Sequence, residues 1–271
     1  MPSFIQITDT HIVARGALTC GRSDTATALQ QAIATINAKL PLLEDVECAI
    51  VTGDLTDHGT PEEYAHFSAI MAALDLPWLA VPGNHDRRDT MRAAFADRCW
   101  MPEDGPVHWT RDFGAFSMVG LDTLLEEAHH GELSNEGFEF LEVALSAIGD
   151  QPIVVATHHP CVPSGIPSMD ADNLRNGAKL LERLSDHPAS VRMISGHVHR
   201  AVTGQIGSIT CQIAPAPGHA VAIDHRADQE PGLVLEPGAV TVYRWKTEMG
   251  PCLISDIVPV GTFSGPWPFE D

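Results

Sequence analysis

The chain has little basic charge for its size. Its 271 residues include 16 Lys and Arg against 36 Asp and Glu, which gives a formal net charge of −20 at pH 7. A surface of this sign repels phosphate backbones at long range, so the charge balance argues against a nucleic acid polymer as partner. Hydrophobic residues make up 44% of the chain, a usual share that can supply a sizeable core.

Paired cysteines and long apolar runs are also lacking. The six cysteines are scattered singly, with no C-x-x-C pair, which argues against a disulfide framework and against a zinc ribbon. A single bridge between subunits stays an open alternative. No apolar run approaches the roughly 18 residues that span a bilayer, and residues 3–7 indicate a strand rather than a secretory signal. We therefore expect a cytoplasmic protein with no membrane partner.

Aromatic residues are scarce at 6% of the chain, and only two of them are Tyr, whereas His occurs 14 times. Histidine is a very common metal ligand, so its excess directs attention to a metal site.

Short apolar runs alternate with amphipathic segments over the first 200 residues. Continuous runs of this kind are typical of strands buried on both faces. The runs are Phe4–Ile7, Cys48–Thr52, Trp78–Pro82, Phe116–Leu121, Ile153–Thr157 and Val191–Ser195. Start signals and apolar stripes predict helices over Asp24–Leu40, from Thr60 onward with Pro61 in the first turn, over Ser134–Leu145 and over Asn173–Leu184.

The pattern changes after Ala201. Three strands are expected there, over Thr203–Ile213, Gly232–Trp245 and Pro251–Val258, with Gly/Pro turns and no helix between them. Because no internal repeat or long linker interrupts the chain, we predict one α/β domain over residues 1–271. Residues from about 201 to 271 form a β-rich, antiparallel extension of it.

Five of the expected strands are followed at once by Asp, Asn or His. Ligands of open α/β sheets bind beyond the carboxyl ends of the strands, so these segments should meet in one crevice. Oxygen and imidazole donors without thiolate suit Mn, Fe, Co or Zn and argue against a structural, Cys-rich zinc site. The segments are Asp9-Thr10-His11, Gly53-Asp54-Leu55-Thr56-Asp57-His58-Gly59, Gly83-Asn84-His85-Asp86, His158-His159-Pro160 and Gly196-His197-Val198-His199.

Seven of these side chains are candidate metal ligands. Seven donors are too many for one tetrahedral ion and enough for two ions that share a carboxylate. One Asp-x-His or His-x-His motif alone is more often a surface feature than a ligand pair, but five matches at strand ends in order are a specific signal. The candidates are Asp9, His11, Asp54, Asn84, His158, His197 and His199.

In this order the motifs resemble those of the calcineurin-like metallophosphoesterase superfamily, over residues 5 to about 200. The chain is more closely similar to the bacterial class III cyclic nucleotide phosphodiesterase and glycerophosphodiesterase group, which shares Thr60-Pro61-Glu62-Glu63-Tyr64 and Pro217-Gly218-His219. The tail Ser264-Gly265-Pro266-Trp267 resembles the glycerophosphodiesterase branch, which is usually oligomeric. The resemblance implies a layered β-sandwich flanked by helices (αββα) and a homo-oligomer.

The resemblance also implies a role for each motif residue. One metal would be held by Asp9, His11 and His199, and the second by Asn84, His158 and His197, with Asp54 bridging the two. His159 then lies behind the ligands or in the substrate pocket. His85 would sit beside the phosphate and either stabilise the transition state or protonate the leaving alkoxide, and His219 would contact the phosphate or the leaving group.

These roles predict hydrolysis of a small phosphodiester, either a glycerophosphodiester or a 3',5'-cyclic nucleotide, by attack of a metal-bound hydroxide. Asp54 and His85 are the expected catalytic residues, and Asn84, His85, His159 and His219 the expected substrate contacts. Two metals of the set Mn, Fe, Zn and Co are the expected cofactors. The alternatives are a phosphomonoesterase or nucleotide pyrophosphatase on the same scaffold, and a non-catalytic metal-binding module, which would require a missing ligand.

Several residues keep two interpretations. Asp57 and Asp86 either orient a histidine or cap a turn or helix. His225 either lines the substrate pocket or lies in a solvated loop. The remaining histidines are expected at the surface and four aromatic residues in the core. These histidines are His58, His66, His108, His129, His130 and His187, and the aromatic residues are Trp78, Phe95, Phe116 and Phe140.

Overall fold

Two β-sheets form the centre of the computed structural model, which describes residues 1–248, 250 and 252–269. The five-stranded sheet has the order β13-β12-β1-β2-β3, and the six-stranded sheet has the order β4-β5-β6-β7-β9-β8. The strands of the first sheet are β1 (Ser3–Ile7), β2 (Val46–Thr52), β3 (Trp78–Val81), β12 (Ala239–Lys246) and β13 (Cys252–Pro259). Those of the second are β4 (Trp109–Asp112), β5 (Ser117–Gly120), β6 (Ile153–Ala156), β7 (Val191–Ser195), β8 (Val202–Ile206) and β9 (Ile209–Ile213).

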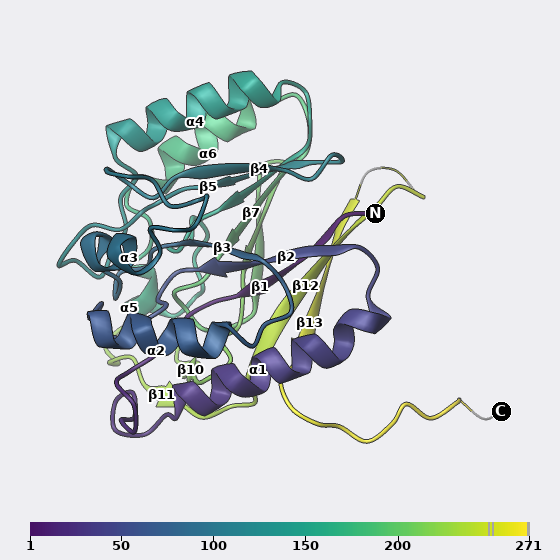
Figure 1. Cartoon of the computed structure of the whole chain (residues 1–271). Helices are drawn as coiled ribbons and strands as arrows, with labels where there is room; N and C mark the ends of the chain where they lie inside the picture. Colours follow the sequence, from purple (N-terminus) through teal and green to yellow (C-terminus); the bar gives the residue numbers. More distant parts are fainter. Residues whose placement is uncertain (249, 251, 270–271) are drawn as a thin grey trace.

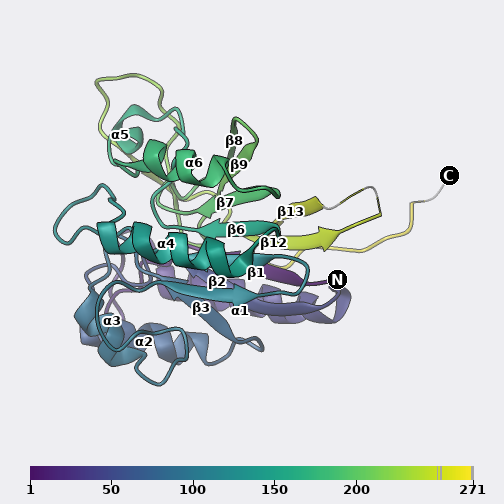
Figure 2. The ribbon, with the colours of Figure 1, turned by 90° about the horizontal axis from the view of Figure 1, so that it is seen from above.

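Helices cover the outer faces of the sheets, so that the layers run helix, sheet, sheet, helix (Figure 1). Seen from above, α4 and α6 lie over the six-stranded sheet, with α1, α2 and α3 on the far side of the molecule (Figure 2). The helices are α1 (Thr25–Lys39), α2 (Pro61–Met71), α3 (Arg88–Ala94), α4 (Asn135–Ile148), α5 (Pro167–Asp170) and α6 (Gly177–Ser185), and a 3-10 turn, η1 (Leu40–Leu42), follows α1. This is the expected layered α/β sandwich. None of the described helices combines the length and apolar character that crossing a bilayer requires.

The inner strands are parallel, as their continuous apolar sequences predict. In the first sheet, β1 pairs in parallel with β2, and β2 with β3. In the second sheet, β5 pairs in parallel with β6, β6 with β7, and β7 with β9. Every residue of β1, β3, β5 and β6 is buried. Parallel strands bring their carboxyl ends to one edge, and this edge carries the polar motifs.

Three helices begin at the expected capping residues. Asp24 accepts a hydrogen bond from the Thr27 amide, and Ser134 accepts one from the Gly137 amide. Thr60 and Glu63 form a reciprocal capping box at the start of α2. Such caps satisfy amide groups that have no partner within the helix.

The expected helix over Asn173–Leu184 is shorter than predicted, because its first residues have a different bonding pattern. The Leu174 carbonyl accepts from the Gly177 amide in a tight turn, and the first bond of helical spacing runs from the Leu180 amide to the Asn176 carbonyl, so the helix starts only at Gly177. The prediction that His66 lies at the surface is also wrong. Its ring is buried, and Nδ1 lies 2.8 Å from the Val13 carbonyl oxygen.

The C-terminal strands are built into both sheets. The expected strand over Thr203–Ile213 is the hairpin of β8 and β9, and β9 pairs in parallel with β7. The segment Gly232–Trp245 holds two strands: β11 (Leu233–Val234), which pairs with β10 (Ala220–Val221), and β12, which pairs antiparallel with β1. The expected strand over Pro251–Val258 is β13, but Pro251 lies outside the described residues.

A buried polar network joins the two sheets below the motif loops. The Gln6 side chain is fully buried and donates to Thr52 Oγ1 at 2.7 Å and to the Ser195 carbonyl at 3.0 Å. Tyr243 donates its hydroxyl hydrogen to Gln6 Oε1 at 3.0 Å. Because Ser195 ends β7 and the other residues lie in the first sheet, Gln6 links the two sheets directly.

Replacement of Gln6 by Leu should lower the free energy of unfolding by about 3 kcal/mol, because buried partners lose their hydrogen bonds. Tyr243→Phe removes one bond and should cost about 1 kcal/mol. Chemical denaturation of the two single variants and the double variant measures both effects. If the free energy of unfolding falls by the same small amount in all three variants, the network does not contribute to stability.

Candidate metal centre

The loops after β1, β2, β3, β6 and β7 come together at one edge of the sandwich. Asp9 donates its amide hydrogen to the Gly53 carbonyl, and Gly196 donates to the His158 carbonyl. The His197 amide lies 3.0 and 3.1 Å from the two Asp9 carboxylate oxygens. These bonds link loops from both sheets, and the seven candidate ligands lie among them.

Asp54 lies between two groups of donors. Its Oδ1 accepts a hydrogen bond from the His85 amide at 2.9 Å. Its Oδ2 lies 3.4 Å from His11 Nε2 and 3.3 Å from His158 Nε2. One oxygen is thus held by the backbone, while the other faces a histidine on each side.

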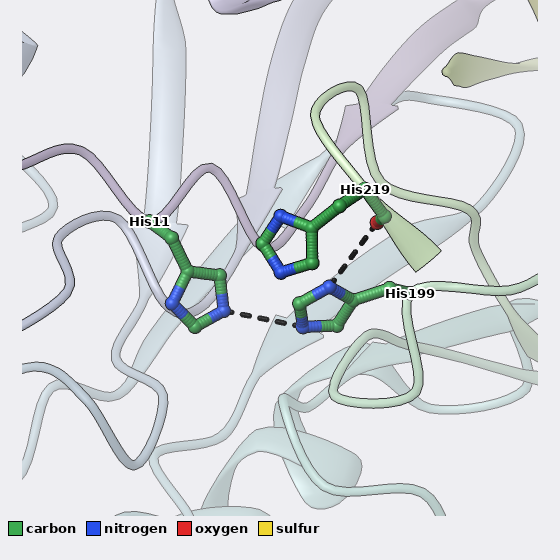
Figure 3. A group of neighbouring side chains, drawn as sticks. All are labelled: His11, His199 and His219. Carbon is green, nitrogen blue, oxygen red and sulfur yellow. Dashed lines mark hydrogen bonds between the residues drawn. The ribbon is translucent and has the colours of Figure 1, made fainter. Parts of the chain in front are cut away.

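The first donor group contains Asp9, His11 and His199. The two Nε2 atoms of His11 and His199 are 3.1 Å apart, and His199 Nε2 is 3.5 Å from Asp9 Oδ1. Ligand atoms of these three residues and Asp54 all lie within 4.8 Å of one another. Figure 3 shows His11 and His199 with their Nε2 atoms facing each other.

The second donor group contains Asn84, His158 and His197. Asn84 Oδ1 lies 3.0 Å from His158 Nε2 and 3.1 Å from His197 Nδ1. All three side chains are buried. The structure thus brings together the residues of each predicted ligand set, with Asp54 between the two groups.

Hydrogen bonds on the outer side of the rings determine which nitrogen faces the centre. His11 Nδ1 lies 2.9 Å from Asp57 Oδ1, His158 Nδ1 lies 2.8 Å from the Thr52 carbonyl, and His199 Nδ1 lies 3.3 Å from the His219 carbonyl. These oxygens can only accept, so each Nδ1 donates. When such a ring carries no second proton, it presents the lone pair of Nε2 to the centre, as a metal ligand must.

The arrangement fits a metal centre. Two Nε2 lone pairs at 3.1 Å repel each other unless a proton or a cation lies between them. Burial lowers the pKa of His197 and His199 well below the usual value, with further contributions from His158 and His11 respectively. These rings are therefore neutral near pH 7, which is the form that binds metal.

Asp54 and His158 form the main charge pair of the site. Burial acts to raise the pKa of Asp54, but the charges of His158 and His85 outweigh it and hold the pKa well below the usual range. Burial acts to lower the pKa of His158, and Asp54 reverses this and raises it to about 9. Asp54 is therefore a carboxylate anion throughout the neutral pH range.

The ligand loops are strained and closely packed. Asp9, His11, Asp54, His197 and His199 all have positive φ, between 40° and 73°. Non-glycine residues rarely adopt this conformation, and those that do cluster at functional sites. A Cβ at Gly83 would lie 2.2 Å from Asp54 Oδ1, so only glycine lets the third loop approach the central carboxylate.

His85 and His219 lie beside the two donor groups. The His85 ring packs edge-on against His11, with 4.6 Å between centroids, and its Nδ1 donates to the Asp57 carbonyl at 2.8 Å. Its Nε2 is thereby left available. The His219 ring lies 4.7 Å from that of His199 (Figure 3), and its Nδ1 has no hydrogen-bond partner among the described residues.

The structure separates the roles of His159, Asp57 and Asp86. His159 is fully buried, with its nitrogens 2.8 Å from Thr123 Oγ1 and 3.1 Å from the His129 carbonyl. It lies behind His158 rather than at the cavity surface. Asp57 is the carboxylate that orients a histidine, through the bond to His11 described above.

Among the described residues, Asp86 has no hydrogen bond or ion pair with a histidine. It accepts hydrogen bonds from the amides of Leu55, Thr56 and Gly83 and from the Tyr64 hydroxyl, and so holds the second and third motif loops together. The sequence leaves both roles open for each of these two residues; the structure places Asp57 on a histidine and Asp86 on backbone amides.

A cavity of about 550 Å³ opens over these residues. Its floor contains His11, Asp54, Asn84, His197 and His199, with Asp57, His85 and His219 beside them. Its outer wall is formed by Thr19, Cys20, His129, Ser168, Met169, Asp172, Ala220, Val221, Glu230, Pro231, Gly232 and Leu233. His225 does not line the cavity and is exposed.

The fold and this arrangement of donors are those of a metallophosphoesterase. The chain belongs to the calcineurin-like phosphoesterase family, whose model matches residues 2–201.

Individual relatives extend this likeness over almost the whole chain. A protein of Arcobacter nitrofigilis named "Probable glycerophosphodiester phosphodiesterase GpdQ" is 34% identical over 98% of this chain and 96% of its own length. A "Probable cyclic nucleotide phosphodiesterase" of Rhodopseudomonas palustris is 35% identical over 82% of this chain and 80% of its own. A dimetal phosphatase from Danio rerio has a similar fold, with a TM-score of 0.64 at 14% identity, covering 96% of this chain and 99% of that one.

Replacement of Asp57 by Ala should weaken metal binding about 10- to 100-fold, because His11 loses the partner that fixes its orientation. Asp57→Asn keeps an acceptor oxygen and should restore most of the affinity. Titration of each protein with Mn²⁺ by calorimetry measures the change. Equal affinity in the Ala variant and the natural protein would contradict the orienting role of Asp57.

Proposed function

We propose that this protein is a dinuclear metal-dependent phosphodiesterase that hydrolyses small phosphodiesters. The observation that carries this proposal is the position of Asp54, with one carboxylate oxygen between His11 and His158. A carboxylate placed between two convergent donor groups is suited to two cations that share it. Asp9, His11 and His199 would hold one cation and Asn84, His158 and His197 the other, with Asp54 common to both.

Two bound cations would supply charge that stabilises the phosphate oxygens and a water of lowered pKa that attacks phosphorus. The residues of the chain provide the remaining functions. The bond from the His85 amide to Asp54 Oδ1 fixes the shared carboxylate. The bonds on Nδ1 of His11, His158 and His199 fix the three imidazoles before substrate binds.

His85 is the residue suited to act on the substrate itself. Its ring is about one-third exposed, it lines the cavity, and its Nδ1 is occupied by the Asp57 carbonyl. When the ring carries a second proton, Nε2 can donate to a phosphate oxygen or to the leaving alkoxide. His219 faces the same cavity from the other side and is a second contact for the substrate, and Asn84 contributes from the floor.

The substrate class follows from the site and from the relatives. Their names specify glycerophosphodiester and cyclic nucleotide phosphodiesterases. A cavity of about 550 Å³ is large enough for either kind of small diester. The oxygen and imidazole donors suit Mn, Fe, Zn or Co as the two metals.

We further propose a cytoplasmic homo-oligomer. All six cysteines are free thiols, the form favoured in a reducing compartment. The C-terminal segment leads away from the body of the molecule (Figure 1) and exposes Phe263, Trp267 and Phe269. Exposed aromatic side chains of this kind are suited to contact a second subunit.

Removal of metal by a chelator should abolish hydrolysis of bis(p-nitrophenyl) phosphate, and added Mn²⁺ or Co²⁺ should restore it. The rate on the diester should exceed that on p-nitrophenyl phosphate measured with the same metal-loaded protein. Absence of activity with every metal tested would refute the proposed function. Faster hydrolysis of the monoester would instead indicate a phosphomonoesterase.

Two single substitutions should separate metal binding from proton transfer. Asn84→Ala removes a ligand and should lower both the metal content and the rate. His85→Ala should retain the metal and lower kcat by about 10²–10⁴-fold, because the side chain is not one of the candidate ligands and its Nε2 is free to act on the substrate. Metal analysis and steady-state kinetics of the two variants give the comparison. Unchanged metal content and activity in the Asn84 variant would overturn the ligand assignment.

A further inference from the structure

The end of β5 also carries an acidic residue, Asp122, which lies outside the five motifs. Since β5 is parallel to β6, Asp122 stands at the same edge of the second sheet as His158. Its carboxylate is completely buried, and it lines neither the metal centre nor the cavity above it. A buried charge is costly unless it is paired, so the partner of Asp122 shows what this carboxylate holds in place.

The partner is Arg88, the first residue of α3. Its Nε donates to Asp122 Oδ2 at 2.7 Å and its Nη2 donates to Asp122 Oδ1 at 2.8 Å, so the guanidinium binds both carboxylate oxygens. The amides of Val107 and Leu124 donate to the same two oxygens, each at 2.9 Å. A two-point contact of this kind fixes the orientation of both groups as well as the distance between them.

On the side of Arg88, the ion pair holds the loop that carries Asn84 and His85. This loop runs from β3, in the first sheet, to α3. The N-terminus of α3 has no side-chain cap, so capping does not fix the end of the loop. The contact of Arg88 with Asp122 ties this end to the second sheet instead.

On the side of Asp122, the chain leads to the two histidines that follow β6. Thr123, the next residue, has its Oγ1 2.8 Å from His159 Nδ1. A Cβ at Gly131 would lie 2.3 Å from the same nitrogen, so the segment after β5 encloses His159 closely. The His159 ring packs edge-on against that of His158, with 4.8 Å between centroids. The position of the segment after β5 therefore bears on that of His158.

The ion pair thus joins the two loops that must meet in the second donor group. Asn84 comes from the first sheet and His158 from the second, and Asn84 Oδ1 lies 3.0 Å from His158 Nε2. In the first donor group, the loop of Asp9 and His11 is bonded instead to the backbone of the loop after β2. A change in the ion pair should therefore affect one donor group and not the other.

We propose that Arg88 and Asp122 are positioning residues for the second cation, which keep Asn84 at the correct distance from His158. They contact neither the cation nor the substrate and act through the two loops that their ion pair joins. This inference rests on the proposed dinuclear centre and assigns one buried ion pair to one of its two cations. The first cation should not depend on the pair.

Substitutions of Arg88 test the proposal. Arg88→Met removes the cation and both bonds to Asp122, whereas Arg88→Lys retains a charge but cannot form the two-point contact. Arg92→Met is the matched control, because it removes a cation from the same helix, where Arg92 donates to the carbonyls of Pro102 and Gly105. Calorimetric titration with Mn²⁺ gives the affinity of each site, and the EPR signal of a coupled Mn²⁺ pair reports that both sites are filled.

We expect the natural protein and the Arg92 variant to bind two Mn²⁺ and to give the coupled signal. Arg88→Met should weaken one site by about tenfold and leave the other within about twofold. At limiting Mn²⁺ the coupled signal should then give way to that of isolated Mn²⁺, and Arg88→Lys should show a smaller change in the same direction. Asn84→Ala identifies the weakened site: in a protein that already lacks this ligand, Arg88→Met should change the remaining affinity by less than about twofold.

The undisturbed site also serves as a measure of folding, because an unfolded chain loses both. Equal affinities in Arg88→Met and the natural protein, or equal weakening of both sites, overturn the proposal while the dinuclear centre stands. If Arg88→Met does not fold, Arg88→Lys decides by the same criteria, since it leaves Asp122 with a cation. If the natural protein binds fewer than two Mn²⁺, the proposed dinuclear centre fails and this inference fails with it.

Discussion

The shared carboxylate of Asp54 is the constraint on which the rest of the site depends. The position of this carboxylate requires that β2 lie between β1 and β3, so that the loop after β2 can meet the loops after β1 and β3. It requires glycine at position 83, where a Cβ would collide with Oδ1. It also requires that the second sheet lie close enough to bring His158 Nε2 to 3.3 Å from Asp54 Oδ2. The buried Gln6 network ties the second sheet to the first.

Electrostatics explains why so many histidines can be buried together in an acidic chain. Burial lowers the pKa of His197 and His199, and it lowers that of His219 to about 3, so these rings carry no charge near neutral pH. His158 and His11 differ: although burial acts to lower both pKa values, Asp54 raises that of His158 to about 9, and the bond to Asp57 with the charge of Asp54 raises that of His11. Neutral rings oriented by carbonyl oxygens avoid the repulsion that a cluster of imidazolium ions would produce.

The sequence predicts much of the fold and the candidate ligand set, because both depend on local patterns. Apolar strands followed by Asp, Asn or His mark the site, and Thr60 with Glu63 marks a helix start that the structure confirms. The sequence could not show that His66 is buried, since that depends on a bond to Val13, far along the chain. For the same reason it did not identify Arg88 and Asp122, which meet only through tertiary packing.

The contrast between floor and wall has a consequence for how this enzyme family can change. Four of the floor residues, and Asp9 beside them, have left-handed backbone conformations, and their loops are tied together by hydrogen bonds across two sheets. Almost any replacement there disturbs several neighbours at once. Most of the wall consists of residues on the segments around α5 and between β10 and β11, at the surface of the molecule. Substrate preference can therefore drift between related proteins, or be redirected in the laboratory, while the chemistry beneath it is inherited unchanged.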